Sequence, residues 1–119
     1  MTDPVTDPVT AYLDGVEPAK RALIEHYYAL VREVAPEAEP ARKYAMACYA
    51  LRGKGLISVM ATKPGLSIIP FSGTLNAVVA GDFGVSAGGG SLHCTVELPL
   101  PDEAFTELVR LRAAQITGG

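Results

Sequence analysis

Hydrophobic residues in the first third of the chain recur with a helical period. Between Glu17 and Pro36 the apolar positions follow the i, i+4, i+7, i+8 spacing of one helix face. Glu17-Pro18 supplies a start, because proline is favoured at the first helical position, and Ala35-Pro36 supplies a stop. We therefore predict a helix from Pro18 to about Val34. Its apolar stripe is Leu23, Tyr27, Leu30, Val31 and Val34.

A tandem repeat precedes this helix. Asp3-Pro4-Val5-Thr6 is followed at once by Asp7-Pro8-Val9-Thr10, and each Asp-Pro pair suits a helix N-terminus, with aspartate as the cap. Only the second copy leads into apolar residues that need burial. We predict that it starts a short helix that Gly15 ends, and that residues 1–7 form a flexible tail.

The middle of the chain changes to alternating patterns and turn signals that predict strands. Three strands joined by tight turns indicate an antiparallel meander. The expected strands are Arg42–Leu51, Leu56–Lys63 and Leu66–Phe71, separated by turns at Arg52–Gly55 and Pro64–Gly65.

The last third predicts a short helix ending at Ala80, a glycine-rich loop at 84–90, a strand over Ser91–Leu98 and a helix opened by Asp102. Helices packed on one face of an antiparallel sheet are the usual two-layer solution for this order. We predict an α+β two-layer sandwich, built from the meander plus one further strand, with the helices mainly on one face. Residues 8–117 form its single domain.

Composition narrows the function. The chain has 119 residues, 49% hydrophobic residues and a net charge of −3, so broad nucleic-acid binding is not expected. No apolar run has the length of a membrane helix, and no secretory pattern opens the chain. We expect a cytoplasmic domain without a membrane or nucleic-acid partner, either a monomer or a weak homo-oligomer.

Soft metal ligands are few. Cys48, His93, Cys94 and His26 are the candidates, and no Cys-x-x-Cys or His-x-x-x-His spacing is present. His93 and Cys94 are adjacent on a predicted strand, so their side chains point to opposite faces. We predict that both cysteines are unbridged and at least partly buried.

Cations gather around the predicted meander. The turn at Arg52–Gly55 would fold the first two strands together and bring Lys43 opposite Lys63. With Tyr49 on the same open face, these residues form a candidate site for a small anion or an acidic partner. Solubilising charge on an exposed face is the simpler alternative.

Several short stretches together resemble the YdhG-like family, a bacterial domain of unknown function placed near frataxin-like proteins. The resemblance spans Val9 to Ile116. Its matching stretches are Val9–Leu13, Ala35–Ala38, Tyr44–Met46, Gly53-Lys54, Lys63, Leu66–Phe71 and Leu98–Pro101.

The resemblance implies a frataxin-like iron chaperone that holds iron on an acidic surface near the first helix. Oxygen ligands suit iron, and on this chain Asp14, Glu17 and Glu25 are the candidate ligands. The chain lacks polar residues usual in the family: it has Pro64-Gly65 in place of Asn-His, and glycines at 88–90 in place of Ser-Lys-Gly.

These losses favour binding over catalysis, because catalysis needs positioned proton donors and acceptors. The leading hypothesis is a non-enzymatic binding or carrier domain, with iron as the candidate cargo. The alternatives are a small-anion-binding domain, acting as an enzyme or a sensor, and a protein-interaction module.

Overall fold

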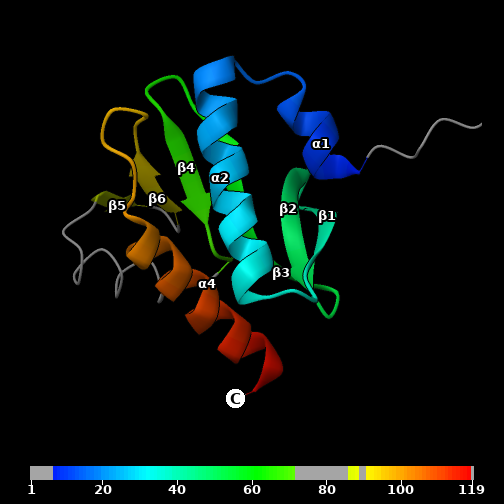
Figure 1. Cartoon of the computed structure of the whole chain (residues 1–119). Helices are drawn as coiled ribbons and strands as arrows, with labels where there is room; N and C mark the ends of the chain where they lie inside the picture. The colour runs from blue at the N-terminus through cyan, green and yellow to red at the C-terminus, as the bar shows by residue number, and fades with distance from the viewer. Residues whose placement is uncertain (1–6, 72–85, 89–90, 119) are drawn as a thin grey trace, which may run out of the picture.

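The computed structural model of the chain describes residues 7–71, 86–88 and 91–118. Within these ranges the chain forms helices and one antiparallel sheet (Figure 1). The helices are α1 (Pro8–Leu13), α2 (Pro18–Val34) and α4 (Asp102–Thr117). The strands are β1 (Glu39–Lys43), β2 (Met46–Leu51), β3 (Lys54–Ala61), β4 (Leu66–Ile69), β5 (Ser86–Gly88) and β6 (Ser91–Cys94).

The sheet has the order β1-β2-β3-β4-β6-β5, and every neighbouring pair is antiparallel. Helices α2 and α4 lie side by side across one of its faces, and α1 covers the β1–β2 end of the sheet (Figure 1). This arrangement confirms the predicted α+β sandwich with an antiparallel meander and helices on one face.

The helix starts follow the predicted signals. The Asp7 carboxylate accepts a hydrogen bond from the Thr10 amide at 2.8 Å and caps α1, with Pro8 at its first position. Pro18 opens α2, and Asp102 opens α4. The acidic first turn of α4 suits the positive end of the helix dipole.

The predicted strand Arg42–Leu51 is wrong. It is a hairpin in which Lys43 pairs with Met46 around a two-residue turn, and its first strand begins at Glu39, before the expected start at Arg42. The turn residues Tyr44 and Ala45 have φ values of 51° and 63°. Two-residue turns with two positive φ values usually contain Asn-Gly or Gly-Gly, and this turn contains neither.

The last strand also differs from the prediction. β6 ends at Cys94, because the chain turns at Thr95, whose hydroxyl accepts the Leu98 amide at 3.0 Å. Strand β5 lies inside the expected glycine loop and pairs with β6, so two strands follow the meander and not one. The helix predicted to end at Ala80 falls outside the described residues.

The core lies between the sheet and the helices, and two tyrosines of α2 fix that contact. The Tyr28 hydroxyl accepts the Val59 amide of β3 at 2.9 Å. Tyr27 donates to the Leu100 carbonyl at 2.7 Å and stacks on Phe105, with ring centroids 4.5 Å apart. Both tyrosines are fully buried, and burial raises the pKa of each phenol. The hydroxyls therefore stay protonated and satisfy buried backbone groups.

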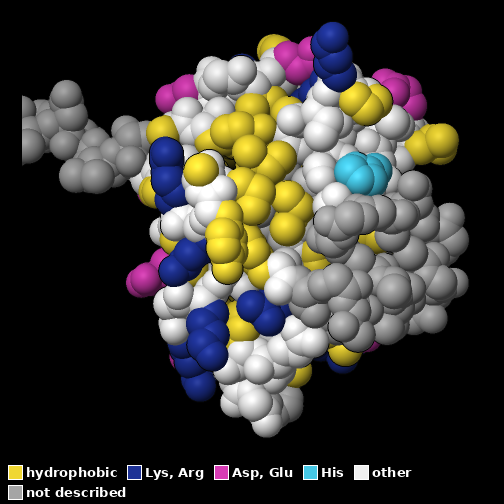
Figure 2. All heavy atoms as spheres, turned by 180° about the vertical axis from the view of Figure 1, so that it is seen from behind, with side chains coloured by type: hydrophobic (Ala, Val, Ile, Leu, Met, Phe, Trp, Pro, Cys, Tyr) yellow, Lys and Arg dark blue, Asp and Glu magenta, His cyan; other side chains and the backbone are white. Residues whose placement is uncertain are grey.

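The other face of the sheet carries no described helix. Figure 2 shows hydrophobic side chains gathered in a band on this side, with lysine and arginine side chains beside it. The strand register and the period-2 alternation assign to this face Met46, Cys48, Ala50, Met60 and Ile69.

The unusual turn residues give a prediction about stability. Ala45→Gly should raise the free energy of unfolding by about 1 kcal/mol, because alanine in the left-handed region carries a cost that glycine avoids. Urea unfolding at constant m-value measures the change. An unchanged or lowered free energy would mean that residue 45 has no positive φ in the folded protein.

Candidate functional site

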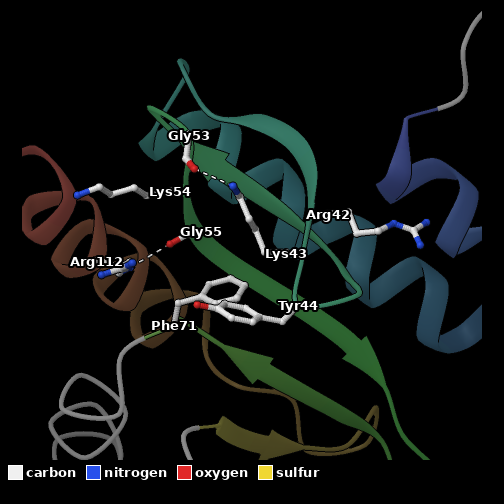
Figure 3. Close-up of a pocket in the computed structure, with 8 residues that line it drawn as sticks. All are labelled: Arg42, Lys43, Tyr44, Gly53, Lys54, Gly55, Phe71 and Arg112. Carbon is white, nitrogen blue, oxygen red and sulfur yellow. Dashed lines mark hydrogen bonds between the residues drawn. The ribbon is translucent and has the colours of Figure 1, made fainter.

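A pocket of about 430 Å³ lies between the β1–β2 turn at one end of β2, the β2–β3 turn at its other end, and α4. We call it the basic pocket (Figure 3). It brings together residues that are up to 70 positions apart in the chain, and none of the described residues that line it is acidic. The lining residues are Arg42, Lys43, Tyr44, Gly53, Lys54, Gly55, Phe71 and Arg112.

Lys43 is held at the pocket by the neighbouring turn. Its ammonium donates to the Gly53 carbonyl at 2.8 Å, which ties the end of β1 to the β2–β3 turn (Figure 3). An ammonium has three donors, so two stay available. Gly53 has a φ of +79°, as the second residue of a two-residue turn of this shape requires.

Arg112 reaches the same pocket from α4. Its Nε donates to the Gly55 carbonyl at 3.1 Å, and one terminal nitrogen donates to Gln115 at 3.1 Å. Burial lowers the pKa of this guanidinium, which nevertheless stays charged at neutral pH. The side chain is thus a partly desolvated cation, and no carboxylate faces it among the described residues of the pocket.

Two aromatic rings form the apolar side of the pocket. Tyr44 and Phe71 lie with ring centroids 6.0 Å apart and an interplanar angle of 30° (Figure 3). The Phe71 ring rests on Gly55 so closely that a Cβ at position 55 would lie 2.8 Å from it. Glycine at position 55 therefore makes room for the ring.

Lys54 also lines the pocket, but its side chain points away from Lys43, and the Arg42 side chain points away from the other labelled residues (Figure 3). Lys54 is exposed at the start of β3, between the two glycines whose carbonyls bind Lys43 and Arg112. The cationic tips of Lys43 and Arg112 and the two rings therefore border one pocket.

The structure does not bring together the predicted anion ligands Lys43, Tyr49 and Lys63. Strand β2 separates β1, which ends at Lys43, from β3, which ends before Lys63, so the expected pairing of the two lysines is wrong. The hairpin at Tyr44 that the sequence reading missed is the cause. Tyr49 points to the helix side, where it is 5% exposed and its hydroxyl accepts Arg32 at 3.0 Å.

The predicted iron ligands lie on the helical side, and all three are exposed. Asp14 caps the end of α1, Glu17 precedes α2, and Glu25 lies along α2. Glu25 lines a small cavity of about 180 Å³ together with Tyr49 and Arg32. Within the described ranges, no group of three or more His, Cys, Asp or Glu residues is placed to hold a metal ion. The carboxylate site stays a prediction.

Both cysteines are free, as predicted; Cys48 is buried and Cys94 is partly buried. Burial raises the pKa of both thiols. His93 is exposed and contacts Ser91, while His26 hydrogen-bonds to Asp102 at 2.8 Å between α2 and α4. In the described part of the chain, none of these four residues belongs to a group of three or more possible metal ligands.

The sequence reading missed Tyr44, Phe71 and Arg112 as pocket residues. Arg112 lies on a helix distant in the chain, and no local pattern marks it. Tyr44 was missed because it occupies the first of two successive two-residue turns, and an aromatic residue is not among those that mark a turn in a sequence.

Comparison with known proteins adds to the fold. No model of a known protein family matches the chain, and no curated protein matches it. A crystal structure at 1.75 Å resolution of YdhG from Bacillus subtilis, a protein of the DUF1801 family, is similar to this chain with a TM-score of 0.81. The two share 16% sequence identity over 92% of this chain and 91% of that one. The similarity confirms the YdhG-like fold expected from the sequence and extends to the fold alone.

None of the helices in the described part of the chain is both long and apolar enough to cross a membrane.

The contact between Gly55 and Phe71 gives a prediction with a matched control. Gly55→Ala should displace the Phe71 ring and shift its NMR resonances and those of Tyr44. Gly53→Ala should leave both rings in place, because no atom lies within 4 Å of the added methyl group. It should instead lower the free energy of unfolding by about 1 kcal/mol through its positive φ. Unmoved ring resonances in Gly55→Ala would disprove the close contact.

The buried thiol gives a second prediction. In a Cys94→Ser variant, the remaining Cys48 should react with a disulfide reagent far more slowly in the native protein than in urea. The rate should rise only above the usual thiol pKa, because burial raises the pKa of Cys48 and the thiolate is the reactive form. Equal native and denatured rates at pH 8 would contradict the burial.

Proposed function

We propose that the chain is a non-catalytic binding domain that takes a small anion in the basic pocket. The observation that carries this proposal is the partly buried guanidinium of Arg112, which lines the pocket together with two lysines, while none of the other described lining residues is acidic. A desolvated cation without a counter-charge is costly, and a bound anion offsets that cost.

The free donors support an anion more than a cation or a neutral ligand. Arg112 uses two of its five N–H groups within the protein, and Lys43 uses one of its three. Their internal bonds hold both side chains in place, so little further side-chain entropy is lost on binding. Charged hydrogen bonds of this kind contribute about 1.5–3 kcal/mol each.

The residues of the pocket support binding rather than catalysis. Among the described residues that line it there is no carboxylate, imidazole or thiol, and these are the groups that most often transfer protons at neutral pH. This composition supports a non-enzymatic binding domain whose proposed ligand site is the basic pocket.

An iron carrier on Asp14, Glu17 and Glu25 stays the second hypothesis, and the described residues offer it no preformed ligand group. The cytoplasmic location also stays a prediction. Titration with ferrous iron tests the iron hypothesis. Iron binding that is lost when these three carboxylates are mutated would favour iron over the anion proposal.

Calorimetric titration with pyrophosphate tests the proposal. We expect saturable binding, and Arg112→Gln should weaken it about tenfold, the effect of losing one charged hydrogen bond. Lys63→Gln is the matched control, because it removes one exposed positive charge away from the pocket and should leave the affinity within twofold. Equal losses in the two variants would indicate a general charge effect, and the pocket would not be the site.

A further inference from the structure

Tyr44 is the residue of the basic pocket that anion binding leaves unexplained. Its side chain is 86% exposed, so it contributes little to the core. Its φ of 51° lies in the left-handed region, where a non-glycine residue, and a bulky one above all, is unusual. The position thus combines a backbone cost with almost no gain from burial.

Another pair of residues would form this turn with less backbone strain, and the chain does not have it. Asn-Gly at positions 44 and 45 would suit a two-residue hairpin turn with two positive φ values. Backbone strain retained where folding does not need it is typical of ligand-binding positions. Phe71 repeats the pattern, with a φ of 58° and its ring laid over Gly55 beside Tyr44.

The two rings and the cations occupy opposite sides of one space. Tyr44 and Phe71 lie together at one side of the pocket, and the tips of Lys43 and Arg112 lie beyond them toward the β2–β3 turn and α4 (Figure 3). The hydrogen-bonded cations are fixed, and the Tyr44 ring keeps most of its surface free for a ligand.

The size of the pocket separates a bare anion from a larger ligand. A water molecule takes about 30 Å³ in the liquid, so a phosphate group of five heavy atoms fills a minor part of about 430 Å³. Sites for small organic ligands begin at about 300 Å³. The remaining space borders the two rings.

We propose that the ligand is a phosphate monoester of mononucleotide size that carries a flat aromatic ring. The ring stacks on Tyr44, and the phosphate binds Lys43 and Arg112. This inference rests on the proposed anion-binding function and adds the ring to it. Stacking on an exposed aromatic side chain tolerates any flat ring, so the class of ligand is defined by one flat ring and one phosphate.

A set of related ligands tests the inference. Calorimetry should give a Kd for adenosine 5′-monophosphate at least tenfold lower than that for ribose 5-phosphate, which keeps the phosphate and lacks the ring. Adenosine, which keeps the ring and lacks the phosphate, should bind more weakly than either. Equal affinities for the two phosphates would overturn the stacking and leave the anion-binding function intact. Absence of binding by both would overturn the inference and the proposed function together.

A substitution at the turn provides the second arm. Tyr44→Asn suits the positive φ, so the variant should stay folded, as its unfolding curve would verify. Its affinity for adenosine 5′-monophosphate should fall to that of ribose 5-phosphate, while its affinity for ribose 5-phosphate stays that of the unmodified protein. Unchanged binding of adenosine 5′-monophosphate by a folded Tyr44→Asn protein would overturn the inference.

Discussion

Two successive two-residue turns, one at each end of β2, position the residues of the basic pocket. The turns at Tyr44–Ala45 and Arg52–Gly53 fix the register of β1, β2 and β3, and each needs positive φ values. A slip by one residue in such a hairpin would move every side chain to the other face of the sheet. The register sets the Lys43 ammonium against the Gly53 carbonyl, and the second turn leads directly to Gly55. The same two turns therefore determine the register of the strands and the position of Lys43 at the pocket.

The helix layer adds the third component from far along the chain. The buried tyrosines of α2 bind backbone groups of β3 and of the segment before α4, and Tyr27 stacks on Phe105 of α4. These contacts fix the axis of α4 over the sheet, so Arg112 near its end reaches the Gly55 carbonyl. The core thus positions the one cation that the meander does not supply.

Local signals in the sequence were enough for the helices and for the fold class. Asp7-Pro8 and Pro18 marked helix starts correctly, and alternation indicated an antiparallel sheet. The first hairpin was missed because Tyr44 and Ala45 lack turn chemistry, and this error carried over to the site, since it paired Lys43 with Lys63. Arg112 was beyond local reasoning, because only tertiary packing brings α4 to the turns. Turn propensity is the rule that failed, and it failed at the position that we propose contacts the ligand.

Mapping of amide chemical shifts during titration with pyrophosphate tests most directly whether an anion binds in the basic pocket. The largest saturable shifts should fall on the amides of Lys43, Lys54 and Arg112, with little change around Asp14 and Glu25. Shifts centred on Lys63 or on the carboxylates of α1 and α2, or no saturable shift at the turns, would contradict anion binding in the pocket.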